Sequence, residues 1–393
     1  MTPAFSLFGQ AFRSCEAGMT VNMSNSVGLI LFAGGERGDH PLIADMRRIR
    51  QACARDALRR ANEAGAFDLI VVVTDDAAWA ATLGDLNVTL DPDPIDATFH
   101  FGRRLFEVIR RYHLDRVFYL GAAACPLLAA DQFTLIAEAV RDDDRVVIAN
   151  NIYSTDWAAI SPAAIVGEWI DRLDQDNALG WVLSNEAGLT PIAWPSSPAT
   201  RLDIDVPIDA QIAALHPQCG STLRAAVSQL NWDDRRVRAA REVIATRATR
   251  VILAGRVPSW AWAQMETSTQ CWTRVFSEER GMRAAGRLQS KQVRSLLNDH
   301  LQAVGLKKFI ADLCDMADAI LWDTRVLWAA NGLWPDAIDR YASDLGQVGW
   351  IADPFIRDFT QAVLEAPIPI VTGGQALVSG GLWALLESMS NNH

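Results

Sequence analysis

Short apolar runs alternate with helical stretches along residues 27–150. Each run is short enough to form one buried strand, and the runs lie at 27–32, 67–74, 116–121 and 145–150. Helices are expected between them, at 44–64, 98–112 and 131–140, and the Asp- and Pro-rich residues 90–96 are expected to form a loop. This alternation predicts a sheet of parallel strands with helices on its faces.

A second alternation of the same kind begins at residue 250. Strands are expected at 250–254, 273–277, from 318 and at 368–371, and helices at 260–266, 291–304, 307–316, 336–345, 353–364 and 377–389. The pattern predicts a Rossmann-like sheet. Between the two patterns, residues 151–199 are expected to alternate helix and loop, 201–209 to form a short strand that runs into a helix, and 210–250 to be helical.

The predicted fold is therefore α/β, with two three-layer αβα domains in tandem. The expected divisions are a loose leader at 1–26, a first domain at 27–216, a helical bridge at 217–250 and a Rossmann-like domain at 251–393. The many arginines of the bridge are expected to lie mostly on a solvated face.

Composition narrows the class of protein. Of the 393 residues, 50% are hydrophobic and 21% charged, which is typical of a globular chain, and the net charge of −11 argues against nucleic acid or an anionic membrane as partner. No apolar run reaches the ~18 residues that a membrane span needs. The six scattered cysteines predict reduced thiols in a cytoplasmic protein. Most of the 14 tryptophans lie at or beyond Trp169, which suggests a homo-oligomer with a buried subunit interface.

A glycine-rich turn follows the first apolar run. Gly34, Gly35 and Gly38 allow close approach of the backbone to a ligand, and the N–H groups of such a turn can cradle a phosphate. The candidate nucleotide-binding residues are this turn, including Glu36 and Arg37, together with Thr74 and Asp75 at the end of the second run. The alternatives are a tight turn without a ligand, and a helix N-cap formed by Asp75 or Asp76.

Two aspartates alternate with apolar residues in the sequence R-L-D-I-D-V-P-I-D at 201–209. The alternation places the carboxylates of Asp203 and Asp205 on the same face of a strand. Two like charges this close favour either a bound cation or a solvated rim.

These motifs, in their order, resemble those of the GT-A nucleotidyltransferase superfamily. The shared elements are the first glycine turn, the G-x-x-x-x-P-L-L that starts at Gly121, and the late D-I-D-x-P-x-D. The molybdenum-cofactor and phospholactate guanylyltransferase type is the most similar, over about residues 27–216. The resemblance implies a mixed sheet, nucleotide phosphates on the first turn, and Mg²⁺ held by aspartates, here Asp203 and Asp205.

The chain departs from the family pattern at two places. Ala124 stands where the family has a metal-binding aspartate, and the turn is not followed by a lysine, since the first lysine of the chain is Lys291. A Mg²⁺ site that lacks one carboxylate loses one of its few oxygen ligands. The sequence therefore leaves open whether the protein is an enzyme.

The second pattern also gathers charged residues after its strands. Arg256, Arg280, Arg283, Arg325, Gly373 and Gly374 form a candidate site for a phosphate or carboxylate. The alternative is that these arginines pair with Glu278, Glu279, Asp323, Asp339 and Asp344. No G-x-G-x-x-G motif follows a strand, so NAD is not indicated.

Three hypotheses remain, and one of them is that the second domain is the catalyst and binds a phosphorylated metabolite through its arginines. The other two concern the first domain. The first is a nucleotidyltransferase-like protein that binds a nucleoside triphosphate or nucleotide sugar and transfers a nucleotidyl group to a small phosphorylated acceptor. The second is a catalytically degenerate nucleotide-binding or scaffold protein whose C-terminal domain binds a phosphorylated metabolite.

Overall fold

The computed structural model describes residues 26–34, 37–93, 98–283 and 285–390. The leader predicted at 1–26, apart from its last residue, and the candidate residues Gly35 and Glu36 lie outside this description. The described chain forms two compact units. Unit 1 contains residues up to Gly34, Leu58–Ala122 and Ala130–Trp194, and unit 2 contains the rest. The division into compact units does not show where independently folding domains begin and end. The domain boundaries expected at 216 and 250 therefore stay predictions.

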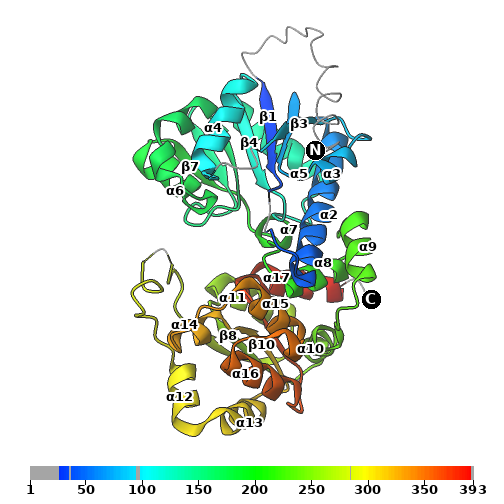
Figure 1. Ribbon diagram of the computed structural model, residues 1–393, viewed down its shortest axis with the longest axis vertical. Coiled ribbons are helices and arrows are strands. Elements are labelled where there is room, and N and C mark those ends of the chain that lie inside the picture. The colour runs from blue at the N-terminus through cyan, green and yellow to red at the C-terminus, as the bar shows by residue number, and fades with distance from the viewer. Residues whose placement is uncertain (1–25, 35–36, 94–97, 284, 391–393) are drawn as a thin grey trace. The chain divides into compact units, whose positions relative to one another are not determined.

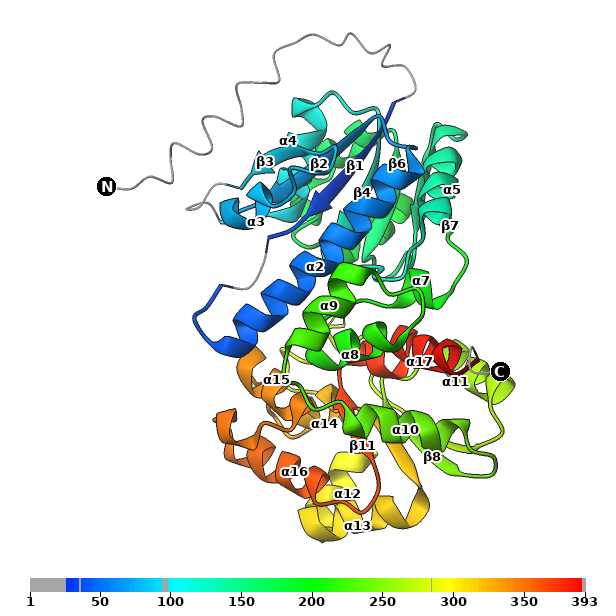
Figure 2. The same cartoon turned by 90° about the vertical axis from the view of Figure 1, so that its right-hand side faces the viewer.

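Unit 1 is built on a mixed sheet of seven strands, called the large sheet here, in the order β3-β2-β1-β4-β6-β5-β7 (Figures 1 and 2). Its strands are β1 (Val27–Phe32), β2 (Leu69–Thr74), β3 (Thr89–Pro92), β4 (Arg116–Gly121), β5 (Val146–Ala149), β6 (Trp157–Ser161) and β7 (Thr190–Ala193). The pairs of β6 with β4 and β5 are antiparallel, which confirms the mixed sheet.

Helices cover both faces of the large sheet. They are α3 (Ala77–Ala81), α4 (Phe101–Arg111), α5 (Ala130–Arg141), the short α6 (Leu179–Trp181) and, in part, α2 (Pro41–Ala64). Tyr119 of β4 joins the core under α4, while its neighbour Phe118 contacts Phe133 of α5. Adjacent residues of a strand point to opposite faces, so α4 and α5 lie on opposite sides.

Three strands of the large sheet lie where the sequence predicted no strand. Residues 90–96 were expected to be a loop but include part of β3, and residues 151–199 contain β6 and β7. β3 and β7 are the edge strands, and both contain a proline, which an edge strand tolerates because one side of its backbone is unpaired. These two strands were therefore not predicted, because a proline within a short run argues against a strand.

Unit 2 is built on a parallel sheet of four strands, called the small sheet, in the order β11-β10-β8-β9. Its strands are β8 (Arg250–Gly255), β9 (Trp272–Ser277), β10 (Ala319–Asp323) and β11 (Ile370–Gly373). The predicted strand positions are confirmed to within a few residues. The chain winds from β8 to β9 in one direction and then back to β10 and β11. Right-handed crossovers in opposite directions place helices on both faces, as in a doubly wound sheet.

The helices of unit 2 follow the predicted alternation, but the short strand expected within 201–209 is wrong. Helices begin at Pro198 and Pro207 and leave too few residues between them, so Asp203 forms only an isolated bridge. The helices of this unit are α7 (Pro198–Arg201), α8 (Pro207–Leu215), α9 (Ser221–Gln229), α10 (Arg235–Ala245), α11 (Ser259–Ser268), α12 (Leu296–Val304), α13 (Leu306–Met316), α14 (Arg325–Ala330), α15 (Ala337–Leu345), α16 (Pro354–Leu364) and α17 (Gly380–Ser390). On one face, Trp322 of β10 packs against Phe309 of α13 and Phe359 of α16. None of the helices described combines the length and the apolar composition needed to cross a bilayer.

One glycine is required where the small sheet ends. Gly255 has a φ of +105°, and a Cβ at this position would lie 2.5 Å from the backbone oxygen of Asp323. Only glycine fits both the backbone conformation and the space. The ends of β8 and β10 therefore approach each other closely, which matters for the charged side chains described below.

Candidate functional site

The carboxyl edge of the large sheet has its topological switch point between β1 and β4. The chain continues from β1 to β2 on one side, whereas β4 lies on the other side. Ala33 N–H donates to Val73 O (2.8 Å) and Ala122 N–H to Phe32 O (2.9 Å), which extends the hydrogen bonding of the strands by one residue. Gly34 follows and is exposed. A crevice outside the strand ends at such a point is where open α/β sheets bind ligands.

The space beside Gly34 is largely open. Among the described residues, a Cβ built on Gly34 would meet only Asp93 Oδ2, at 3.7 Å. No left-handed backbone conformation requires a glycine here. The structure itself therefore tolerates a side chain at Gly34, and the absence of one leaves backbone accessible to a ligand.

Thr74 holds the turn together. Its buried hydroxyl donates to Ala33 O (3.1 Å) and accepts from Asp76 N–H (3.1 Å). Asp76 is the N-cap of α3, where it accepts from Trp79 N–H at 2.9 Å. Of the two aspartates considered as a cap, Asp76 takes that role, and Asp75 is half-buried between it and Thr74.

A charged network beside this turn was not expected from the sequence. The buried Arg104 side chain binds Asp91 Oδ1 (2.8 Å) and Asp93 Oδ1 (2.6 Å) at the end of β3. Burial, together with the charge of Asp91, raises the pKa of Tyr112 to about 12. In the sequence, only the aspartates of residues 90–96 indicated such a network. Their partner Arg104 lies several residues later on α4, where an arginine is usually exposed to solvent.

An aromatic surface also lies at this edge. Phe99 is 58% exposed, and its ring lies edge-on to Phe32 of β1, with 6.1 Å between centroids. Phe32 packs in turn on Phe101 and Tyr119. The buried rings fix Phe32, and Phe99 remains available to stack on a planar ligand.

The predicted metal ligands lie in unit 2, as do the exposed Arg37 and Gly38. Asp203 pairs with Ala124 in an isolated antiparallel bridge, and Asp205 is exposed. The structure thus brings Asp203 beside Ala124, whereas no contact of Asp205 with Ala124 is seen among the described residues. Among the described residues, no group of three or more His, Cys, Asp or Glu side chains is arranged to hold a metal ion.

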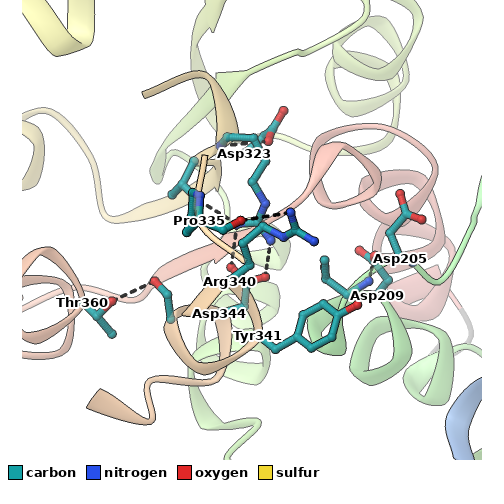
Figure 3. Close-up of polar contacts among 12 residues, drawn as sticks. Asp205, Asp209, Asp323, Pro335, Arg340, Tyr341, Asp344 and Thr360 are labelled. Atoms are coloured by element: carbon teal, nitrogen blue, oxygen red, sulfur yellow. Dashed lines mark hydrogen bonds and ion pairs between the residues drawn. The ribbon is translucent and has the colours of Figure 1, made fainter. Parts of the chain in front are cut away.

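Asp209, the last aspartate of the same motif, is fully buried in the first turn of α8. Its Oδ2 accepts from Asp205 N–H (3.1 Å) and Val206 N–H (3.0 Å), while its Oδ1 has no hydrogen-bond partner within the described chain. Burial raises the pKa of Asp209 well above its ordinary value, and the charges of Asp205 and Asp344 raise it further. Figure 3 shows Asp209 beside Asp205. The carboxyl group of Asp209 therefore keeps its proton to higher pH than an ordinary aspartate does.

The carboxyl edge of the small sheet carries two buried ion pairs. Arg256, just after β8, binds Asp323 at the end of β10 (2.6 Å), and Arg325 binds Asp344 of α15 with both nitrogens (2.5 and 3.0 Å). Two of the candidate anion-binding arginines are thus paired with carboxylates. The alternative of internal pairing holds for these two residues, and likewise for Arg287 with Glu279 (2.8 Å).

The other candidates at this edge differ in their surroundings. Gly373 and Gly374 are buried, with Val206 and Ile208 among the side chains nearest to where a Cβ would lie. Arg280 is exposed on the turn after β9. Arg283, on the same turn, places its guanidinium carbon 4.9 Å from the ring centroid of Trp334.

Comparison with known proteins finds similarity in structure but not in sequence. No protein-family model matches the chain, and no curated protein matches it significantly. Similar solved structures include a nucleotidyl transferase from Methanothermobacter, with 16% identity, a TM-score of 0.34, and coverage of 46% of this chain and 92% of that one. A cytidylyltransferase from Leptospira borgpetersenii has 13% identity, a TM-score of 0.36, and coverage of 52% and 94%.

A third similar structure is 4-diphosphocytidyl-2C-methyl-D-erythritol synthase from Anaerococcus prevotii. It has 11% identity, a TM-score of 0.35, and coverage of 52% of this chain and 96% of that one. These similarities concern the fold of about half of the chain.

Proposed function

We propose that this protein is nucleotidyltransferase-like and binds a nucleoside triphosphate or nucleotide sugar at the carboxyl edge of the large sheet. The observation that carries the proposal is the position of Gly34. It is exposed, lies directly beyond β1 at the topological switch point, and has open space where a side chain would be. These are the properties of backbone that receives a phosphate.

The residues around Gly34 supply complementary chemistry. The backbone of the turn approaches the phosphates, and the exposed ring of Phe99 receives the base by stacking. The hydrogen bonds of Thr74 fix Ala33, at the end of β1, against Asp76, at the start of α3, which supports a pre-formed edge for the ligand.

Nucleotidyl transfer is the reaction that we propose for this site. An oxygen of a small phosphorylated acceptor attacks the α-phosphorus of the nucleotide, and the bond from that phosphorus to the bridging oxygen breaks. The leaving group is pyrophosphate when the donor is a nucleoside triphosphate, and a sugar phosphate when it is a nucleotide sugar. Such a reaction needs positioning and neutralisation of charge rather than a covalent enzyme intermediate.

We propose Mg²⁺ as the cofactor, held by Asp203 and Asp205. Two carboxylates fit this ion only when phosphate oxygens and water complete its shell, which is a common arrangement for Mg²⁺. When bound, the ion supplies neutralisation of phosphate charge. Ala124 beside Asp203 removes the third carboxylate that the family supplies. That observation favours a second candidate function, a nucleotide-binding protein without transferase activity.

Nucleotide binding with and without Mg²⁺ distinguishes the two functions. Thermal stabilisation is measured over a panel of nucleoside triphosphates and nucleotide sugars for the wild type and for a variant with Asp203→Ala and Asp205→Ala. Transferase-like function predicts stabilisation that Mg²⁺ increases in the wild type and not in the variant. The matched control replaces two other exposed aspartates, Asp142→Ala and Asp171→Ala, and is expected to respond like the wild type.

Two results would count against parts of this proposal. Stabilisation that is indifferent to Mg²⁺ contradicts the metal site and supports the nucleotide-binding protein. Stabilisation by no member of the panel contradicts both functions.

A further inference from the structure

The small sheet has its own topological switch point, between β8 and β10. The chain leaves β8 for β9 on one side and returns to β10 on the other. The residues at the two strand ends are Arg256 and Asp323, which form an ion pair. A doubly wound sheet binds ligands outside the strand ends at this point. The small sheet therefore places a second candidate crevice in unit 2, with charged residues at its base.

Three of the arginines around this edge are neutralised by carboxylates: Arg256 by Asp323, Arg325 by Asp344, and Arg287 by Glu279. Arg280 is exposed on the turn after β9. Arg283 and Arg340 are the two that lie beside an aromatic ring at this edge. Within the described part of the chain neither of these two forms an ion pair, and Arg340 donates instead to the backbone oxygen of Pro335 at 3.2 Å (Figure 3). Positive charge is therefore left over at these two residues.

Trp334 brings these two charges together. The guanidinium carbons of Arg283 and Arg340 lie 4.9 and 5.9 Å from the centroid of its ring. Cation–π contacts of this kind hold a guanidinium in place without using its N–H groups. The donors of Arg283 thus remain available for a ligand.

The local charges support the same assignment. Partial burial lowers the pKa of Arg283, and the charges of Arg256 and Arg340 lower it further, whereas Asp205 opposes the effect. Like charges repel one another at this edge of the small sheet, and a bound dianion would relieve that repulsion.

We propose that Arg283 and Arg340 bind the phosphate group of a small phosphorylated metabolite beside Trp334. The guanidinium fork matches the geometry of phosphate oxygens, and two such forks suit a dianion better than the single charge of a carboxylate. This site involves none of the residues assigned to the nucleotide at Gly34, so the two proposals stand or fall separately.

The ligand class is tested by calorimetric titration of the full-length protein with three sets of probes. They are inorganic phosphate, a panel of sugar phosphates with the same sugars lacking phosphate, and dicarboxylates such as succinate. The proposal predicts saturable binding of at least one sugar phosphate, weaker binding of inorganic phosphate, and none of the unphosphorylated sugars. Tightest binding of inorganic phosphate instead would assign the site to the free ion and overturn the metabolite. Binding of dicarboxylates alone would overturn the phosphate.

The residues are tested by Arg283→Gln and Arg340→Gln in the same titration. Each is expected to weaken sugar-phosphate binding about tenfold or more, because each removes a charge-assisted contact. Arg340→Lys keeps the charge without the fork and is expected to retain part of the affinity. The matched control is Arg247→Gln, which makes the same change of charge at an exposed position of unit 2 and is expected to have no effect.

Thermal unfolding and nucleotide binding are measured for the same variants. Thermal unfolding checks that Arg283→Gln is folded, and a folded variant that binds the sugar phosphate as tightly as the wild type overturns the assignment. Nucleotide binding is measured in parallel, and it is expected to be unchanged in Arg283→Gln. A loss of nucleotide binding together with the sugar phosphate would show that one site takes both ligands and would contradict the separation proposed here.

Discussion

Asp209 shows how a single side chain can couple the structure to pH. It is fully buried, one of its oxygens has no partner in the described chain, and burial together with Asp205 and Asp344 raises its pKa. The folded protein therefore holds this proton more tightly than the unfolded chain, whose aspartates titrate near 3.9. The stability that the proton contributes is present in full below that value and is lost as the pH rises through the folded pKa.

Asp209→Asn is expected to remove this dependence. An amide keeps an oxygen to accept the N–H groups of Asp205 and Val206, but it does not ionise. The free energy of unfolding, measured by denaturant titration from pH 4 to pH 8, is expected to fall for the wild type relative to the variant. The slope is about 1.4 kcal/mol per pH unit between the two pKa values. A difference that is constant over this range would contradict a protonated Asp209.

Residue by residue, the sequence indicated where polar groups lie but not which partners they have. Arg256 and Arg325 were candidate ligands for an anion, yet Asp323 and Asp344 neutralise them. Arg340, which belongs to the remaining pair, was not singled out at all. Partners that lie tens of residues apart in the chain meet only after the sheet has formed, so spacing alone does not reveal which charges remain unpaired.

At the scale of elements, the buried pair of Arg325 and Asp344 connects the first residue of α14 to the last turn of α15. Arg325 is 4% exposed and Asp344 0%. Removing one member of such a pair leaves an uncompensated charge in the interior, which is strongly destabilising. An exposed pair contributes much less because water screens it.

Arg325→Met is expected to lower the free energy of unfolding by about 3–5 kcal/mol. The matched control is Arg238→Met, which breaks the exposed pair with Asp234 on α10 and is expected to cost about 1 kcal/mol or less. Chemical denaturation followed by tryptophan fluorescence measures both. Equal costs for the two variants would show that the buried pair does not hold α14 and α15 together.

Element prediction succeeded where burial is continuous. The apolar runs of β1, β4, β8 and β10 are buried nearly throughout, so their sequences resemble parallel strands. It failed at β3 and β7, because each is a short edge strand that contains a proline, and at β6, whose alanines carry little strand preference. The sequence predicted which runs form strands but not their order in either sheet, because strand pairing joins residues that lie far apart in the chain.

At the scale of the whole molecule, the account assigns one ligand to each sheet. Both sheets reverse their winding direction, and such a reversal is where open α/β sheets bind their ligands. In the first proposed site the backbone at Gly34 binds the ligand, and in the second the guanidinium groups of Arg283 and Arg340 bind it. The net charge of −11 makes the local excess of arginine at the second site a specific feature rather than a general property of the surface.

The central claim is that the backbone at Gly34 receives the nucleotide, and a direct titration of Gly34 variants tests it. Gly34→Ala and Gly34→Val fill the space that the phosphates would use, while among the described residues only Asp93 Oδ2 lies within 4 Å of the new Cβ. The matched control Gly84→Ala adds a methyl group at another exposed glycine, with its nearest neighbour at 4.0 Å. We predict that nucleotide affinity falls about tenfold or more in Gly34→Val, equivalent to about 1.4 kcal/mol or more, and is unchanged in Gly84→Ala. A folded Gly34→Val that binds nucleotide as tightly as the wild type would contradict the account.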